Sequence, residues 1–157
     1  MDPKRASAPA WPDKLSPPDP AHVQALLGDY WLTLHRLPDL LNRGELLLAE
    51  ACTTRLRGIV IELMLALNGI AMPADTLHLN GYLGASQRAA LERTLLAPAA
   101  ESAALLGRAV ALTVIYRWYA PQLVEKLHLL PARAEEESTW ALLVAELADW
   151  PTSLTSE

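Results

Sequence analysis

Residues 44–69 read GELLLAEACTTRLRGIVIELMLALNG and predict the central helix of an all-helical protein. The polar residues of the first half form one stripe, made of Glu50, Thr53, Thr54 and Arg57. Beyond Gly58 the segment is apolar on nearly every side, which is typical of a helix enclosed by other helices. Asn68-Gly69 supplies a helix stop, with Pro73 beyond it. We therefore expect a helix from about residue 44 to residue 68 at the centre of a bundle.

The flanking sequence predicts the helices that surround this one. Asp19-Pro20 has the pattern of an N-cap followed by proline at the first helical position, so a helix should start there and run to Leu37. A short helical turn follows in PDLLNRG. Further helices are expected over 86–98, over 99–130 with a kink or restart at Pro121, and over 135–150. No alternating strand pattern of useful length occurs, so the fold class is all-α, a single bundle of about five helices.

Proline divides the chain into three parts. Residues 1–18 contain five prolines, which deny the segment a regular hydrogen-bonded ladder. We expect an extended Pro-rich arm over 1–18, with Trp11 holding it against the body. The helical bundle domain should then occupy 19–150, and a short tail 151–157.

Composition excludes several classes of protein. The chain has 157 residues, 52% of them hydrophobic, which is too apolar for a disordered protein. A single cysteine excludes a disulfide framework and a thiolate zinc site. The net charge of −5 argues against a nucleic-acid partner, and all of the excess falls in residues 133–157. That acidic segment is either a solvated helix start or an electrostatic docking tail.

Nothing in the sequence predicts a membrane partner or export. The Pro-rich start has no apolar core of a signal peptide. The most apolar stretch, from Ile59 to Leu67, is nine residues long and far too short to span a bilayer. We expect a cytoplasmic protein.

The known motifs of catalysis and metal binding are missing. The four histidines are far apart in sequence, and none forms an i, i+3 or i, i+4 metal pair, so we expect no metal site. There is no phosphate-binding glycine loop and no nucleophile elbow. Cys52 is expected to be a small buried hydrophobe.

Glu62 is the first of three groupings that remain. It is the one ionisable residue between Arg57 and Asp75, and it sits in the run IVIELML. Burial would favour its protonated form and could make it a general base. The alternative is a structural ion pair with Arg55 or with an arginine of another helix.

The second grouping is aromatic and basic, and consists of Tyr116, Arg117, Trp118 and Tyr119. Such side chains can stack on a planar ligand or anchor an interface. The alternative is a helix end with its aromatics in the core. The third grouping, His78-Leu79-Asn80, lies in a connector and is either a functional loop or an ordinary turn.

Several motifs in order resemble a known family. Tyr30-Trp31 precedes Leu41-Asn42-Arg43-Gly44-Glu45-Leu46, which is followed by Arg55 and by ELMLALNG at 62–69. This order, over about residues 20–100, resembles the C-terminal helical domain of nucleotidyltransferases of the aminoglycoside and lincosamide adenylyltransferase kind. In that family an aromatic-rich helix leads to an R-G-[ED]-L-like turn and a long central helix.

The resemblance implies a substrate-side helical domain that packs on a nucleotide-binding catalytic domain. The family's catalytic domain carries a Gly-Ser motif and an Asp-x-Asp pair for the metal-bound triphosphate. This sequence has no Asp-x-Asp or Asp-x-Glu, so we expect a chain that does not catalyse adenylyl transfer alone. It would hold no cofactor itself, and magnesium and nucleotide would belong to a separate catalytic domain. In that reading Glu62 and residues 116–119 line one cleft, with Glu62 the base for a substrate hydroxyl. The alternative is a helical interaction protein that forms homodimers through apolar faces.

Overall fold

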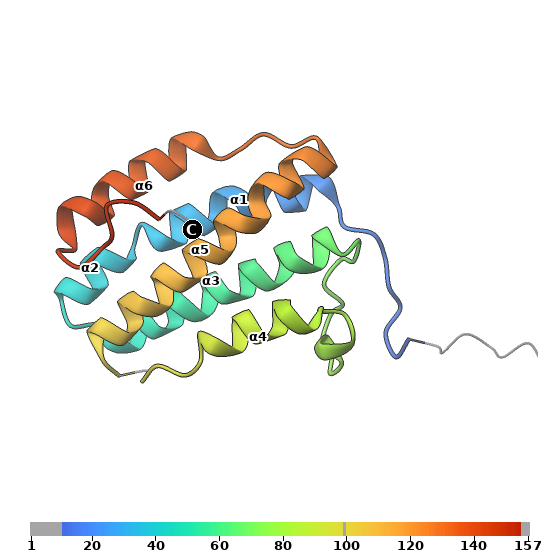
Figure 1. Cartoon of the computed structure of the whole chain (residues 1–157), viewed down its shortest axis with the longest axis horizontal. Coiled ribbons are helices and arrows are strands. Elements are labelled where there is room, and N and C mark those ends of the chain that lie inside the picture. The colour runs from blue at the N-terminus through green and yellow to red at the C-terminus, as the bar shows by residue number, and fades with distance from the viewer. Residues whose placement is uncertain (1–10, 99, 155–157) are drawn as a thin grey trace, which may run out of the picture.

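The predicted central helix is α3, which runs from Leu46 to Leu67. It packs against α5 along one side and against α1 along another, and it also contacts α2 and α4. Figure 1 shows α3 and α5 side by side through the middle of the molecule, with α4 below them and α6 above. The structure is a computed structural model that describes residues 11–98 and 100–154, and these form helices and no strand. The other helices are α1 (Pro20–Leu34), α2 (Leu37–Asn42), α4 (Ala85–Arg93), α5 (Ser102–Leu127), α6 (Arg133–Glu146) and the 3₁₀ turn η1 (Leu79–Gly81).

The all-helical bundle confirms the fold class predicted from the sequence. Its core is continuous across the helices, and the largest fully buried side chains include Trp31 and Tyr30 of α1 and Met64 of α3. Residues 59, 60 and 63–66 of α3 are all buried, as expected for a helix enclosed by its neighbours. Within the described residues, none of the helices combines the length and apolarity that crossing a bilayer requires.

A proline lies at the start of α1, and another lies just beyond its end. The Asp19 carboxylate accepts a hydrogen bond from the backbone N–H of Ala21 at 3.1 Å, which confirms the predicted cap. The helix ends at Leu34, three residues earlier than expected. The chain restarts as α2, with Pro38 in the first turn, where no intrahelical N–H is needed.

The stop after the central helix is confirmed. Gly69 adopts a left-handed φ of 84°, and its N–H donates to the carbonyl of Ala66. The N–H of Ile70 donates to the carbonyl of Leu65, which closes the helix end. Asn68 then exchanges two amide hydrogen bonds with Gln87, at 2.8 and 3.1 Å, and so joins the end of α3 to the start of α4.

Helix α4 differs from its prediction at both ends. It is capped at Gly84, whose N–H donates to the Gln87 side chain at 2.8 Å, and the expected cap Ser86 lies inside it. It ends at Arg93, well before Pro98, and this leaves Leu95 and Leu96 exposed.

The last two helices also correct the sequence boundaries. Helix α5 passes through Pro121 without a restart, and this proline is exposed. It ends at Leu127, where His128 takes a left-handed φ of 55°. Helix α6 spans 133–146, earlier than the expected 135–150, and Trp150 folds back edge-on against Trp140 at 5.7 Å.

Residues 11–18 form the described part of the predicted arm, and they lie along the connection between α3 and α4. The Asp13 carboxylate accepts hydrogen bonds from Thr76 Oγ1 and Tyr82 Oη, each at 2.6 Å. The Trp11 ring lies 5.7 Å from the Tyr82 ring, which confirms the expected contact with the body. Residues 1–10 of the arm and 155–157 of the tail lie outside the described residues.

Candidate functional site

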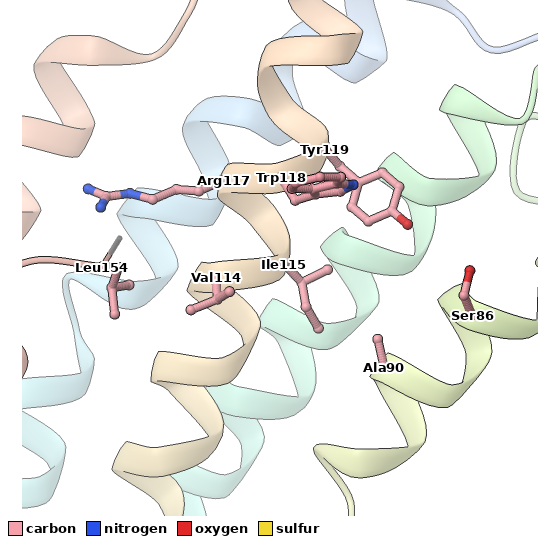
Figure 2. Close-up of a pocket in the computed structure, with 8 residues that line it drawn as sticks. All are labelled: Ser86, Ala90, Val114, Ile115, Arg117, Trp118, Tyr119 and Leu154. Carbon is pink, nitrogen blue, oxygen red and sulfur yellow. The ribbon is translucent and has the colours of Figure 1, made fainter. Parts of the chain in front are cut away.

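The four predicted ligand residues, 116–119, point in different directions. They lie on one turn of α5, where successive side chains are about 100° apart, so the four cannot all share one face. One enters the core, one turns to α6, and the last two face the side of α4. Figure 2 shows the Arg117 side chain extending away from the Trp118 and Tyr119 rings.

Tyr116 belongs to the core. Its ring stacks on Tyr30 at 4.3 Å and meets Trp31 edge-on at 5.2 Å. Its hydroxyl donates to the carbonyl of Leu27 at 2.9 Å. Burial raises the pKa of Tyr116 well above the ordinary value for tyrosine. Its edge lines an open hollow of about 430 Å³ between α5 and the start of α6.

Arg117 is engaged with α6. Its Nη2 lies 2.9 Å from Glu136 Oε1, and its Nε donates to the same oxygen at 3.1 Å. The guanidinium carbon also lies 4.2 Å from the centre of the Trp140 ring, in a cation–π contact. A ligand that needed this charge would have to displace both partners.

Trp118 and Tyr119 line an open hollow on the surface of α5. The hollow has a volume of about 350 Å³. Val114 and Ile115 complete its floor, α4 forms one side and the C-terminal segment the other (Figure 2). Trp118 is 63% exposed although it is the largest apolar side chain of this surface. The remaining lining residues are Ser86, Ala90, Arg117 and Leu154.

Glu62 lies in a different hollow, so the expected shared cleft is not formed. Its Oε2 atom lies 2.6 Å from Nε2 of His22, in a small hollow of about 90 Å³ between α1 and α3. The carboxylate side chain is 27% exposed, less enclosed than the sequence indicated. Its partner is a histidine, and Arg55, the predicted candidate, lies instead 4.0 Å from Asp29.

The sequence did not predict the residues that complete the Glu62 hollow or the hollow at Trp118. His22 is 40 positions from Glu62, and no local pattern connects them. Ser86, Ala90 and Leu154 approach α5 from distant segments. One signal was present: the spacing of Val114 and Trp118 places both on one face of a helix. In the third predicted grouping, His78 precedes the 3₁₀ turn η1, and Leu79 and Asn80 are the first two residues of that turn.

The described residues contain no cluster of side chains suited to bind a metal ion. Among them, no three His, Cys, Asp or Glu side chains come together in a way that could hold a metal ion. Cys52 is buried and its Sγ donates to the carbonyl of Thr33, which confirms its expected packing role.

Comparisons with protein-family models, with curated proteins and with solved structures find no match to this chain.

Proposed function

We propose that this chain is a helical ligand-binding domain of the kind that forms the C-terminal part of aminoglycoside and lincosamide nucleotidyltransferases. It binds a small molecule in the hollow on α5 and does not catalyse a reaction alone. The observation that carries the proposal is the exposed Trp118 ring over an apolar floor. Large apolar groups left open in a concave surface are typical of binding sites.

The chemistry of the hollow favours a neutral or weakly charged ligand. Among the described residues no carboxylate lines it, and the one cation among them, Arg117, is held by Glu136. The hydroxyls of Ser86 and Tyr119 and the indole N–H of Trp118 are its uncharged side-chain hydrogen-bonding groups. A polycationic aminoglycoside needs carboxylates, whereas a lincosamide presents apolar surface and hydroxyls. Within the family's substrates, we therefore favour a lincosamide-like molecule.

In this proposal the chemistry of adenylyl transfer belongs to a separate catalytic domain. That domain would supply the Asp-x-Asp pair, magnesium and the nucleotide. Glu62 has no part in binding, because it is paired with His22 in a separate hollow. A neighbouring reading frame with Gly-Ser and Asp-x-Asp motifs would support the two-part enzyme, and mixing the two chains would then restore adenylyl transfer.

Tryptophan fluorescence tests the binding site directly. In a Trp11→Phe background, Trp118 is the one tryptophan among the described residues that is mostly exposed. We expect lincomycin to change its emission saturably and kanamycin to change it much less. Trp118→Ala should weaken lincomycin binding, followed by calorimetry, at least about 10-fold, as is typical of a central aromatic contact. Leu130→Ala, which removes an exposed side chain outside the hollow, should have no effect. Unchanged lincomycin binding in Trp118→Ala would refute the assignment.

A homodimer is the second candidate, favoured by the same surface. Val114 and Trp118 are 42% and 63% exposed on neighbouring turns of α5, and exposed apolar faces of this kind also bury against a second copy. Sedimentation distinguishes the two proposals. A dimer at micromolar concentration that becomes a monomer in Trp118→Lys would support the homodimer, and a monomeric wild type would exclude it.

A further inference from the structure

Two arginines from different helices meet where the α4–α5 connection crosses α3. Arg57 of α3 donates through Nε to Thr94 Oγ1 at 2.8 Å and through Nη2 to the Thr94 carbonyl at 3.3 Å. Arg108 of α5 donates through Nη2 to the carbonyl of Ala97 at 2.6 Å. Both guanidinium groups thus face the same connection.

The positive charge at this place exceeds the negative charge that faces it. Glu50 is the carboxylate nearest to Arg108, at 3.9 Å from its Nη1, and the same oxygen accepts a hydrogen bond from Thr54 at 2.8 Å. Burial, together with the nearby charge of Arg108, lowers the pKa of Arg57, and Glu50 opposes this effect. Among the described residues, two cations therefore share one carboxylate, and an incompletely paired charge on the buried Arg108 is unfavourable.

Arg108 also has an unused donor. The side chain is 6% exposed, and its Nε is buried with no hydrogen-bond acceptor among the described residues. Buried polar groups normally have partners, so an orphaned guanidinium donor points to a missing acceptor. Guanidinium groups pair best with planar or tetrahedral oxyanions, which accept two N–H bonds at once.

We propose that a phosphate group binds between Arg57 and Arg108, at a site separate from the hollow on α5. Glu50 occupies part of this position without a ligand and moves aside when phosphate binds. Its 39% exposed side chain has solvent to move into. The phosphate would accept from Arg108 Nε and from the unused N–H groups of Arg57.

Thermal unfolding in phosphate tests the site on the intact chain. We expect 10 mM inorganic phosphate to raise Tm by about 3–6 °C over sodium chloride of equal ionic strength, for a dissociation constant of about 1 mM. AMP at the same concentration distinguishes a phosphate carried by a nucleotide from free phosphate. A larger rise with AMP assigns the site to a phosphomonoester, and a rise with inorganic phosphate alone assigns it to the free ion. The absence of any rise over chloride with either probe would overturn the proposal.

Matched variants localise the effect. Arg57→Gln should abolish the phosphate-dependent rise, and Glu50→Gln should enlarge it by removing the competing carboxylate. Arg43→Gln is the control, because that arginine pairs with Asp39 on the exposed surface of α2. A rise that persists in Arg57→Gln, or that disappears equally in Arg43→Gln, would contradict the site.

Nuclear magnetic resonance gives a readout that needs no variant. The Nε–Hε signal of Arg108 should move saturably with added phosphate. The signal of Arg43 should move no more than it does in chloride. Equal movement of the two signals would show nonspecific screening and overturn the proposal.

Discussion

The Nε2 atom of His22 lies 2.6 Å from Oε2 of Glu62 and joins the first turn of α1 to the apolar half of α3. Glu62 is the one ionisable residue in that half of the helix. Whether it has a structural or a reactive role therefore depends on the side chain that it contacts. The side chains are 56% and 27% exposed, which places the pair at the edge of the core. This geometry supports the structural alternative, a hydrogen-bonded pair with histidine in place of arginine.

Replacing Glu62 with Gln should have a modest effect on stability. Because the pair is solvent-accessible, we expect Glu62→Gln to lower the free energy of unfolding by about 0.5–1 kcal/mol in urea titrations. A double-mutant cycle with His22→Ala should give a coupling of about 0.5 kcal/mol. A loss above ~3 kcal/mol would instead indicate a fully buried charge and contradict this interpretation.

The sequence predicted the helix that carries Glu62 but not its partner. Hydrophobic periodicity over 44–69 depends on local spacing, so α3 and its stop at Gly69 followed from neighbouring residues. The pairing with His22 depends on how α1 packs against α3. Such long-range packing cannot be predicted from a local sequence pattern. The prediction also missed that the polar end of Glu62 reaches the edge of the core.

The buried pair of Tyr30 and Thr113 should be more costly to disrupt. The hydroxyl oxygens lie 2.8 Å apart, and Thr113 donates onward to the carbonyl of Ala109. Tyr30 therefore donates to Thr113. Thr113→Val keeps the shape but leaves the Tyr30 hydroxyl buried without an acceptor, which costs about 1–3 kcal/mol.

Tyr30→Phe is the matched control for that variant. It removes the donor itself and leaves a threonine that still bonds to Ala109, so we expect a smaller loss of about 0.5–1.5 kcal/mol. Chemical denaturation of the two variants measures both values. A larger loss for Tyr30→Phe than for Thr113→Val would reverse the assigned direction of the hydrogen bond.

Cys52 should be nearly inert toward thiol reagents. Burial raises its pKa to about 11, and the side chain is 8% exposed. Because the thiolate is the reactive form, a rise of about two units lowers its fraction roughly 100-fold at pH 8. We expect labelling by a disulfide reagent at pH 8 to be at least about 100-fold slower in the folded protein than in urea. Rapid labelling of the folded chain would show that the packing around Cys52 opens readily.

The candidate site was predictable only in part, and helix geometry explains why. Residues 116–119 were grouped because they are adjacent in sequence, yet adjacency on a helix separates side chains. Tyr116 and Arg117 are held by the core and by α6, and Trp118 is left open. The hollow at Trp118 is formed together with α4 and Leu154. Their positions depend on the paths of the flanking loops, which local sequence patterns do not predict.

Acid should release the N-terminal arm through Asp13. Hydrogen bonds from Thr76 and then from Tyr82 lower the pKa of this carboxyl, with a smaller contribution from the charge of His78. Because the pKa of Asp13 is lower in the folded protein than in the unfolded chain, its carboxylate stabilises the folded state at pH values above the unfolded pKa. This stabilisation is lost as the pH falls through the pKa of Asp13 in the folded protein. The arm should therefore stay attached above about pH 4 and detach below it.

In a Trp118→Phe background, the emission of Trp11 against Tyr82 should change over that range. Asp13→Asn should show the detached emission already at pH 7 and no acid transition. If Asp13→Asn matches the wild type at pH 7, the carboxylate does not hold the arm.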